Sequence, residues 1–192
     1  MICYAMCGSF CTLDHSFDIL EALSLSGYEL LPVMSEAVYT TDTRFGKAAD
    51  HISRMEKLCS RSVIHTITDA EPVGPKYKPD SMIIAPCTGN TLAKLANGIT
   101  DTPVTMAAKA HLRNNKPLCI ALATNDALSA NLQNIGKLCS RKNIYFVPLL
   151  QDDPIKKPSS LISKFELLPL TLEYALKGEQ LMPLFLGALP TK

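Results

Sequence analysis

Residues 83–94 read IIAPCTGNTLAK. The segment begins with apolar residues that are typical of a buried strand, continues with small polar residues, and ends in a helical pattern. Thr88 or Asn90 could cap this helix, because Thr and Asn side chains accept hydrogen bonds from its first free N–H groups. The same helix N-terminus could bind a phosphate, since Gly89 allows a ligand to approach the backbone closely. The segment alone leaves both roles open.

Short apolar runs alternate with amphipathic stretches along the rest of the chain, as in βαβ units with a parallel sheet. Helical spacing predicts helices at residues 104–113 and 168–176, while the Pro-rich residues 71–79 and 151–160 are expected to be long loops. We therefore expect an α/β fold, a Rossmann-like (flavodoxin-like) doubly wound parallel sheet in a single domain over residues 1–192, with a C-terminal helix and tail from about residue 160. The strands are predicted at residues 2–6, 29–34, 63–67, 82–85, 118–123 and 144–147.

Two other predicted strands also end in small polar residues. Gly8 and Ser9 close the first strand, and residues 124–126 (TND) close the fifth. Because the carboxyl ends of parallel strands share one edge of a sheet, the three polar loops are expected to converge. Neither the Gly-x-Gly-x-x-Gly fingerprint nor a P-loop is present, which disfavours a dinucleotide or a triphosphate. A singly phosphorylated nucleotide fits this pattern better.

The composition excludes several classes of partner. The chain has 19 Lys and Arg against 18 Asp and Glu, so no charge excess favours nucleic acid or a membrane surface. The first residues lack a basic segment typical of a signal peptide, and prolines and charges interrupt the apolar C-terminal segment, so a cytoplasmic protein is expected. Seven cysteines without paired Cys-x-x-Cys spacing predict neither a disulfide framework nor a metal site.

The stretch PCTGNT at residues 86–91 resembles the Pro-Ala-Ser-Ala-Asn-Thr motif of the flavoprotein family that includes phosphopantothenoylcysteine decarboxylases and lantibiotic cysteine decarboxylases, and the match continues through LAKLANGITD. This resemblance implies bound FMN and, commonly, a homo-oligomer in which a neighbour's residues complete each flavin site. Leu122 and Thr124 replace the family's Pro and Met beside Asn125, and the decarboxylases' active-site His falls near Pro72. The FMN contacts that the resemblance implies are Gly8, Ser9, Ser35, Pro86, Thr88, Gly89, Asn90, Thr91 and Asn125.

A resemblance over nearly the whole chain is to the family of dipicolinate synthase B subunits. It rests on TDTRFG at 41–46, AEPVGPK at 70–76, TDTPVTMAAKAHLRNNKP at 100–117, TNDAL at 124–128 and QDDPIKKP at 151–158. It implies an oxidoreductase that converts a dihydrodipicolinate precursor to dipicolinate (pyridine-2,6-dicarboxylate) in the mother cell of a spore-forming bacterium. It also implies a partner A subunit that supplies NAD(P). Two alternatives stay open: a non-catalytic partner subunit with a decayed flavin site, and an FMN-dependent decarboxylase.

A substrate with two carboxylates calls for a cationic clamp, and Arg binds carboxylates in a bidentate manner. Arg44 in TDTRFG is the first candidate, followed by Lys76 and Arg113. Side chains of this kind are more often solvated surface charges. The sequence assigns no other catalytic residue.

Overall fold

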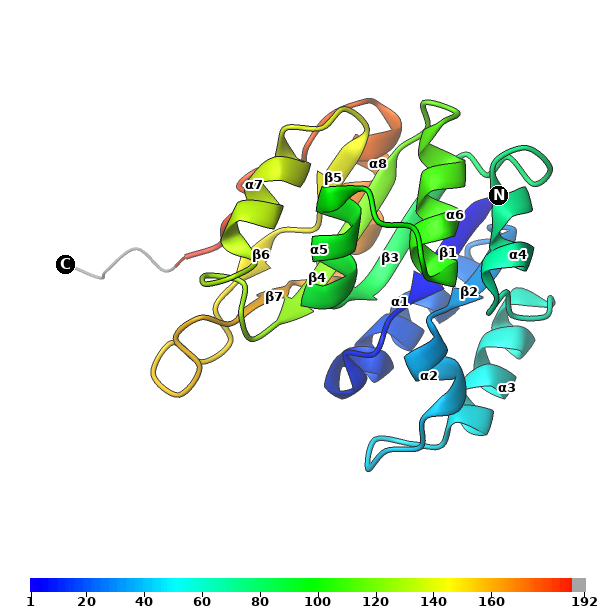
Figure 1. The fold of residues 1–192 in the computed structure, drawn as a ribbon, viewed down its shortest axis with the longest axis horizontal. Coiled ribbons are helices and arrows are strands. Elements are labelled where there is room, and N and C mark those ends of the chain that lie inside the picture. Colours follow the sequence, from blue (N-terminus) through cyan, green and yellow to red (C-terminus); the bar gives the residue numbers. More distant parts are fainter. Residues whose placement is uncertain (188–192) are drawn as a thin grey trace.

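In the computed structural model, which describes residues 1–187, seven strands form one sheet with helices on both faces (Figure 1). The parallel strands lie in the order β2-β1-β3-β4-β5, which is the flavodoxin-like doubly wound order. The α/β fold predicted from the sequence is therefore confirmed. Residues 188–192 of the predicted domain and tail lie outside the described residues. The parallel strands are β1 (Ile2–Met6), β2 (Leu30–Met34), β3 (Ser81–Cys87), β4 (Leu118–Thr124) and β5 (Ile144–Phe146).

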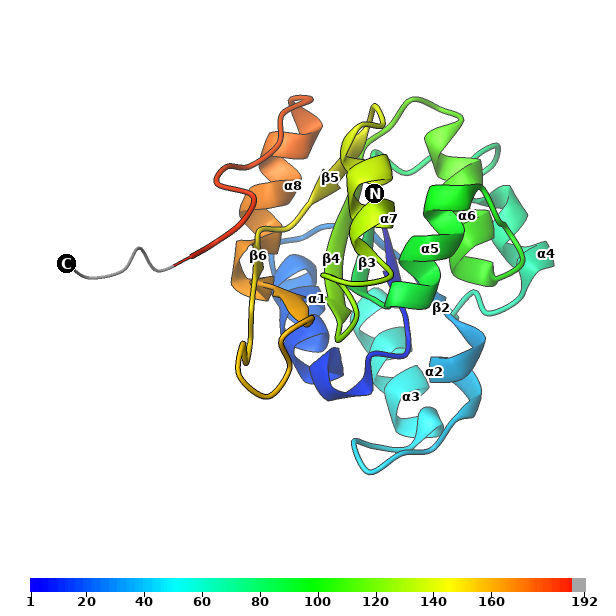
Figure 2. The same cartoon turned by 60° about the vertical axis from the view of Figure 1, so that its left-hand side comes forward.

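The helices form two layers around this sheet (Figure 2). One face is covered by α1 (Leu13–Leu25), α3 (Ala48–Cys59) and α8 (Leu168–Leu176), and the other by α5 (Gly89–Asn97), α6 (Pro103–Leu112) and α7 (Leu132–Cys139). Within residues 1–187, no helix combines the length and the apolar character needed to cross a membrane. The short elements are α2 (Glu36–Thr40), α4 (Ile67–Ala70) and the 3-10 turns η1 (Phe10–Thr12), η2 (Glu71–Val73) and η3 (Phe165–Leu167).

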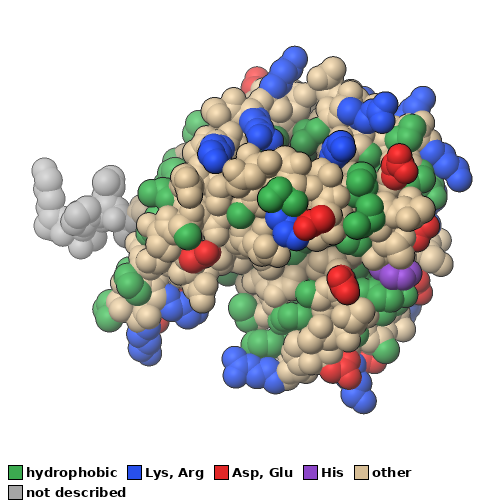
Figure 3. Space-filling view, in the orientation of Figure 1, with side chains coloured by type: hydrophobic (Ala, Val, Ile, Leu, Met, Phe, Trp, Pro, Cys, Tyr) green, Lys and Arg blue, Asp and Glu red, His purple; other side chains and the backbone are tan. Residues whose placement is uncertain are grey.

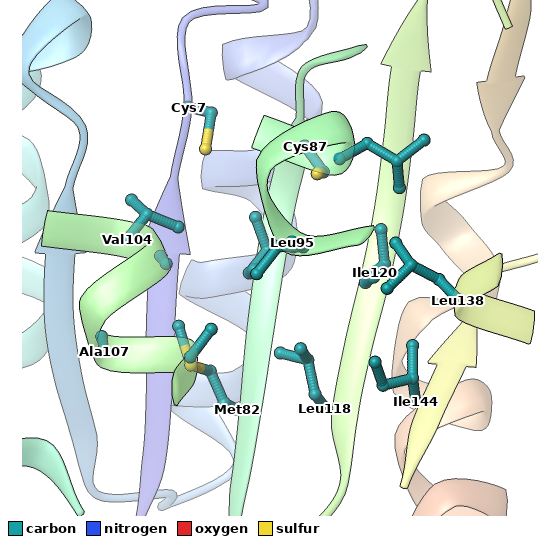
Figure 4. Close-up of a cluster of buried hydrophobic side chains, with 14 of the residues drawn as sticks. Cys7, Met82, Cys87, Leu95, Val104, Ala107, Leu118, Ile120, Leu138 and Ile144 are labelled. Carbon is teal, nitrogen blue, oxygen red and sulfur yellow. The ribbon is translucent and has the colours of Figure 1, made fainter. Parts of the chain in front are cut away.

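The strands are buried on both sides, as expected of a parallel sheet covered by helices. All five residues of β1 are buried, and their side chains alternate between two hydrophobic cores. Figure 4 shows one of these cores, in which residues of α5, α6 and α7 pack onto β3, β4 and β5. On β1, Cys3 and Ala5 face this core, while Ile2, Tyr4 and Met6 face α1 and α8.

A buried polar network links β1 and β3 to α1. The Tyr4 hydroxyl donates to the Ser16 carbonyl oxygen at 2.9 Å, and the Ser16 hydroxyl donates to the Ala85 carbonyl oxygen. Tyr4 and Ser16 have no exposed surface, so these hydrogen bonds satisfy groups that water cannot reach. The network holds the carboxyl-terminal part of β3, just before Pro86 and Cys87, against the first layer of helices.

The prediction of a strand at residues 63–67 is wrong. This segment makes only an isolated parallel bridge between Val33 and Ile64. The Thr66 hydroxyl then accepts a hydrogen bond from the Asp69 N–H at 3.1 Å, and this cap starts α4 at Ile67. A helix start therefore ends the extended segment before it becomes a strand.

Two short strands in the C-terminal part of the chain were not predicted. β6 (Leu149–Leu150) and β7 (Leu161–Ser163) form an antiparallel hairpin, and β7 pairs with Ala123 and Thr124 at the end of β4. This pairing brings the loop of residues 151–160, which connects β6 and β7, to the carboxyl-terminal edge of the sheet. The predicted loop is present, and the hairpin sets its position.

Gly74 lies where no side chain fits, because a Cβ atom there would lie 1.9 Å from the Ala110 carbonyl oxygen in α6. We expect Gly74→Ala to lower the free energy of unfolding by about 3 kcal/mol, the upper part of the range for overpacking. Gly136→Ala is the matched control, since a Cβ atom in this position of α7 meets nothing within 4 Å. It should raise the free energy of unfolding by about 0.5–1 kcal/mol. Urea denaturation followed by circular dichroism measures both changes, and equal stability of the two variants would contradict the close approach.

Candidate functional site

A cavity of about 510 Å³ lies at the carboxyl-terminal edge of the sheet, and we call it the strand-end cavity. Three strand ends and two loops contribute to its lining. The loops are residues 41–47, after α2, and residues 151–160, and Figure 3 shows the molecule hollowed between these two projections. In a doubly wound sheet this edge is where ligands bind. The lining residues are Gly8, Ser9, Phe10, Cys11, Thr12, Arg44, Phe45, Thr88, Gly89, Ala123, Thr124, Asn125, Asp152, Lys157, Ser160, Leu161 and Ile162.

The first polar turn follows β1. The Ser9 carbonyl oxygen accepts hydrogen bonds from the N–H and the hydroxyl group of Thr12, at 3.0 and 2.8 Å, which fixes the turn η1. A Cβ atom at Gly8 would lie 3.2 Å from the Ala37 Cβ atom, so only glycine lets α2 approach without adjustment. The Ser9 hydroxyl makes no hydrogen bond within residues 1–187, so it remains available to a ligand.

The second polar turn joins β3 to α5. The Thr88 hydroxyl accepts a hydrogen bond from the Thr91 N–H at 3.2 Å, so Thr88 rather than Asn90 caps the helix. The buried Thr91 hydroxyl contacts the Cys7 sulfur at 3.3 Å and thus supports the turn from below. The N–H groups of Gly89 and Asn90 donate no hydrogen bond to any of the described residues. The helix therefore offers unpaired donors and the positive end of its dipole beside the cavity.

The third polar turn, after β4, is held by the Asp126 carboxylate. This group accepts hydrogen bonds from the Thr124 hydroxyl at 2.5 Å and from the Asn131 amide at 2.9 Å. A Cβ atom at Gly89 would lie within 2.8 Å of polar atoms of all three side chains, so glycine is required where the second and third turns meet. The exposed Asn125 side chain lines the cavity and makes no hydrogen bond within residues 1–187.

The structure brings most of the predicted site residues together. Gly8, Ser9, Thr88, Gly89 and Asn125 all line the strand-end cavity, as does Arg44, the candidate carboxylate clamp. Their roles as ligand contacts stay predictions.

The other predicted residues lie outside the lining of this cavity. Pro86 and Thr91 are buried beneath it, and Asn90 is exposed on the first turn of α5. The Ser35 hydroxyl at the end of β2 is buried without a hydrogen-bond partner in the described part of the chain. Lys76 and Arg113, the other two candidates for binding a substrate carboxylate, are exposed and do not line the cavity.

Several lining residues were not predicted from the sequence. Phe10, Cys11 and Thr12 reach the cavity because η1 follows the first strand end directly. Asp152 and Lys157 reach it because the Ser160 hydroxyl donates to the Thr124 carbonyl oxygen at 3.3 Å and anchors their loop to β4. The only available sequence signal was the closely spaced charges in QDDPIKKP.

An ion pair forms on the loop side of the cavity. The Lys157 ammonium lies 2.9 Å from the Asp152 carboxylate. Burial opposes ionisation of Asp152, but the hydrogen bond from Lys157 and the nearby Ser160 hydroxyl outweigh this effect and lower the pKa of the carboxyl group. The same hydrogen bond raises the pKa of Lys157. Both groups therefore carry their charges at neutral pH.

The cysteines beneath the cavity are neutral thiols. Burial raises the pKa of Cys7 to about 11, despite the opposing hydrogen bond from Thr91. Burial, followed by the neighbouring Cys7, also raises the pKa of Cys87 well above its ordinary value. A thiol reacts as its thiolate, so Cys87 is packed as a small apolar side chain and is not a nucleophile.

We predict that two of the seven cysteines react in the folded protein. Cys11 and Cys139 are exposed and should be alkylated by iodoacetamide at neutral pH, whereas the five buried thiols should react only after unfolding. Cys11 should react faster, because burial raises the pKa of Cys139. Mass spectrometry of peptides after timed alkylation measures each site. Rapid labelling of Cys7 or Cys87 in the native protein would contradict this packing.

Comparisons with known proteins agree with this geometry. The family model described as Flavoprotein matches residues 1–163. The dipicolinate synthase B subunit of Bacillus subtilis is 48% identical over 181 residues, covering 94% of this chain and 90% of the relative. The crystal structure of the dipicolinate synthase B subunit from Bacillus halodurans has 41% identity and a TM-score of 0.89, covering 98% of this chain and 96% of that one. A dodecameric FMN-dependent UbiX-like decarboxylase from Escherichia coli shares the fold at 24% identity, with a TM-score of 0.63 and coverage of 77% and 80%.

Proposed function

The chain belongs to the flavoprotein family, and we propose that it is the FMN-binding B subunit of a dipicolinate synthase, which oxidises a dihydrodipicolinate precursor to dipicolinate. The observation that carries the proposal is the convergence of Ser9, Thr88 and Asn125 on one cavity at the carboxyl-terminal edge of the sheet. The identity of 48% over 94% of the chain to a dipicolinate synthase B subunit supports the choice of reaction.

The groups around the cavity suit a singly phosphorylated nucleotide. We assign the FMN phosphate to the Ser9 hydroxyl and to the N–H groups of Phe10 and Cys11, for which no acceptor is found within residues 1–187. The ribityl chain is assigned to Thr88 and to the free N–H groups at the start of α5. Asn125, which has an unpaired amide at the cavity, is assigned to the edge of the isoalloxazine ring. Neutral donors of this kind bind a phosphate without a lysine.

The reaction removes a hydride and a proton from the dihydropyridine ring, which becomes aromatic. Bound FMN supplies a two-electron acceptor of the kind that this step needs. The chain's own residues bind and orient the substrate, and Arg44 on the loop of residues 41–47 binds one of its carboxylates. NAD(P) on a partner A subunit would supply the final electron acceptor. Asn90, which is exposed on the first turn of α5, is assigned with Thr88 to the phosphate or ribityl side of the flavin.

The described residues disfavour the two alternatives. The lining of the cavity contains no histidine in residues 1–187, and Pro72, near which the decarboxylases' His falls, lies in η2 packed against α6. The described residues of one copy therefore supply no imidazole to this cavity. The two residues that replace the family's Pro and Met leave the strand end before Asn125 intact, since Leu122 is fully buried in β4 and Thr124 hydrogen-bonds to Asp126.

Asn125→Ala tests the assignment of the flavin edge. The free side chain makes no internal hydrogen bond, so its removal should leave stability unchanged while weakening FMN binding about three- to tenfold, as expected for one lost hydrogen bond. Titration of FMN fluorescence against the purified chain measures the Kd. Gln133→Ala, on the exposed face of α7 outside the cavity, is the matched control and should bind FMN like the wild type. An unchanged Kd for Asn125→Ala would refute its assigned contact.

Protection of Cys11 tests where FMN binds, independently of activity. Cys11 lines the cavity, whereas Cys139 lies at the end of α7 away from it. Saturating FMN should slow the alkylation of Cys11 at least tenfold and leave the rate at Cys139 unchanged. Equal rates at Cys11 with and without FMN would argue against binding in this cavity.

Reconstitution with the A subunit tests the reaction itself. The yellow protein should oxidise the dihydrodipicolinate precursor only when both subunits are present, measured as the absorbance of dipicolinate. A colourless B subunit that is nevertheless required for activity would favour the non-catalytic partner role.

A further inference from the structure

Pyridine-2,6-dicarboxylate carries two anionic groups on one planar ring, and a site with two separate cations would select it over a monocarboxylate. The proposed function supplies one of these, Arg44, and the following inference rests on that function. The second cation must face the same cavity from another direction. Of the residues that line the strand-end cavity, Arg44 and Lys157 are the two with permanent positive charge.

Arg44 is presented by a tight, anchored turn. Thr43 and Gly46 exchange backbone hydrogen bonds of 3.0 and 3.2 Å, which leaves Arg44 and Phe45 at the tip. Gly46 has a φ of +139°, and a Cβ atom there would lie 2.7 Å from the His51 ring, so the turn is pressed closely onto α3. The hydrogen bonds between Thr43 and Gly46 and the packing of Gly46 on α3 therefore hold the tip in place.

The side chains at this tip are suited to a planar anion. The Arg44 guanidinium carbon lies 4.8 Å from the centre of the Phe45 ring, and no carboxylate within residues 1–187 pairs with this arginine. The Phe45 ring is 42% exposed and also lines the cavity. The guanidinium lies over one face of the Phe45 ring, so the exposed remainder of the ring offers an apolar contact and the guanidinium a bidentate carboxylate partner.

Lys157 approaches the cavity from the loop of residues 151–160. The loop closes on itself, because the Lys157 N–H donates to the Asp153 carbonyl oxygen at 2.8 Å and the Ser160 N–H donates to the Lys157 carbonyl oxygen at 3.0 Å. The Asp152 carboxylate then holds the Lys157 ammonium at 2.9 Å. An ammonium group has three donors, so two remain free for a ligand after this contact.

Stability does not account for this ion pair. The Lys157 side chain is 56% exposed and that of Asp152 is 28% exposed, and pairs of this kind contribute about 0–1 kcal/mol to folding. The neighbouring Lys156 is also exposed but does not line the cavity. In Figure 3, basic side chains stand on both sides of the hollow between the two projections. Lys157 is thus the lysine of its loop that lines the cavity, where the Asp152 carboxylate holds its ammonium.

We propose that Arg44 and Lys157, from opposite loops of the strand-end cavity, bind the two carboxylates of one planar dicarboxylate, and that Phe45 packs against its ring. Asp152 acts as a positioning residue that orients Lys157. The pair sets specificity for two carboxylates and takes no part in the transfer of electrons.

Calorimetric titration of the FMN-saturated chain tests this proposal without depending on turnover. The probes are pyridine-2,6-dicarboxylate, benzene-1,3-dicarboxylate, which has the same carboxylate geometry but does not chelate metals, and pyridine-2-carboxylate. The wild type should bind both dicarboxylates at least tenfold more tightly than the monocarboxylate, and higher salt should reduce this preference. Arg44→Gln and Lys157→Gln should each weaken dicarboxylate binding at least tenfold and remove most of the preference.

Three further variants act as controls. Lys157→Arg keeps the charge and should restore binding to within about threefold of the wild type, as expected for a retained charge-assisted hydrogen bond. Lys156→Gln and Lys47→Gln remove exposed charges next to the two clamp residues, outside the cavity lining, and should bind like the wild type. Circular dichroism and the FMN Kd confirm that each variant is folded and holds its cofactor.

The outcomes separate this inference from the proposed function. A wild-type chain that binds dicarboxylates, together with a Lys157→Gln variant that binds them equally well, would overturn the two-cation site and leave the proposed function intact. A wild-type chain that binds FMN but neither dicarboxylate would overturn both. Equal losses in Lys156→Gln and Lys157→Gln would indicate a general charge effect and would also overturn the inference.

Discussion

The parallel alignment of β1, β3 and β4 is the constraint on which the candidate site depends. Residues of β1 pair in register with β3 from Ile2 and Ser81 onward, and β3 pairs with β4 from Met82 and Leu118, with one shift in register between Ile84 and Cys87. Because the three strands start together and run in the same direction, they end at the same edge. The hydrogen bonds among Tyr4, Ser16 and Ala85 tie this register to α1. Any slip between these strands would separate the three polar turns.

The sheet also explains why chemistry is confined to this edge. The strands are buried on both faces, so most of their side chains are apolar, the Cys87 thiol is kept neutral by burial, and the Tyr4 hydroxyl is paired with Ser16. Polar groups become useful only where the strands end and backbone N–H groups lose their partners. The close approach of Gly89 to the carboxylate and amide groups of Asp126 and Asn131 then locks two of the turns together. A rigid rim results, although it is built from loops.

The sequence predicted what depends on local pattern. Buried apolar runs marked the five parallel strands, and small polar residues after them marked the turns that converge. The strand prediction for residues 63–67 failed because the helix cap at Thr66 outweighed the strand preference of the segment's β-branched residues. Asn90 belongs to the right motif, but its side chain leaves the first turn of α5 in a direction that spacing cannot reveal. The 151–160 loop was missed as part of the site because its position depends on the long-range pairing of β7 with β4.

The strand ends and the two loops around the cavity offer different groups to a ligand. The strand ends contribute neutral donors, which suit a cofactor that every turn of the sheet helps to hold. The charged groups, Arg44, Asp152 and Lys157, come from two loops that are each closed by their own hydrogen bonds. Because such loops tolerate change without disturbing the sheet, the fold can keep its cofactor edge while the loops determine which anion enters. If the proposed function holds, the specificity of the chain would reside in the loops and its cofactor chemistry at the edge of the sheet.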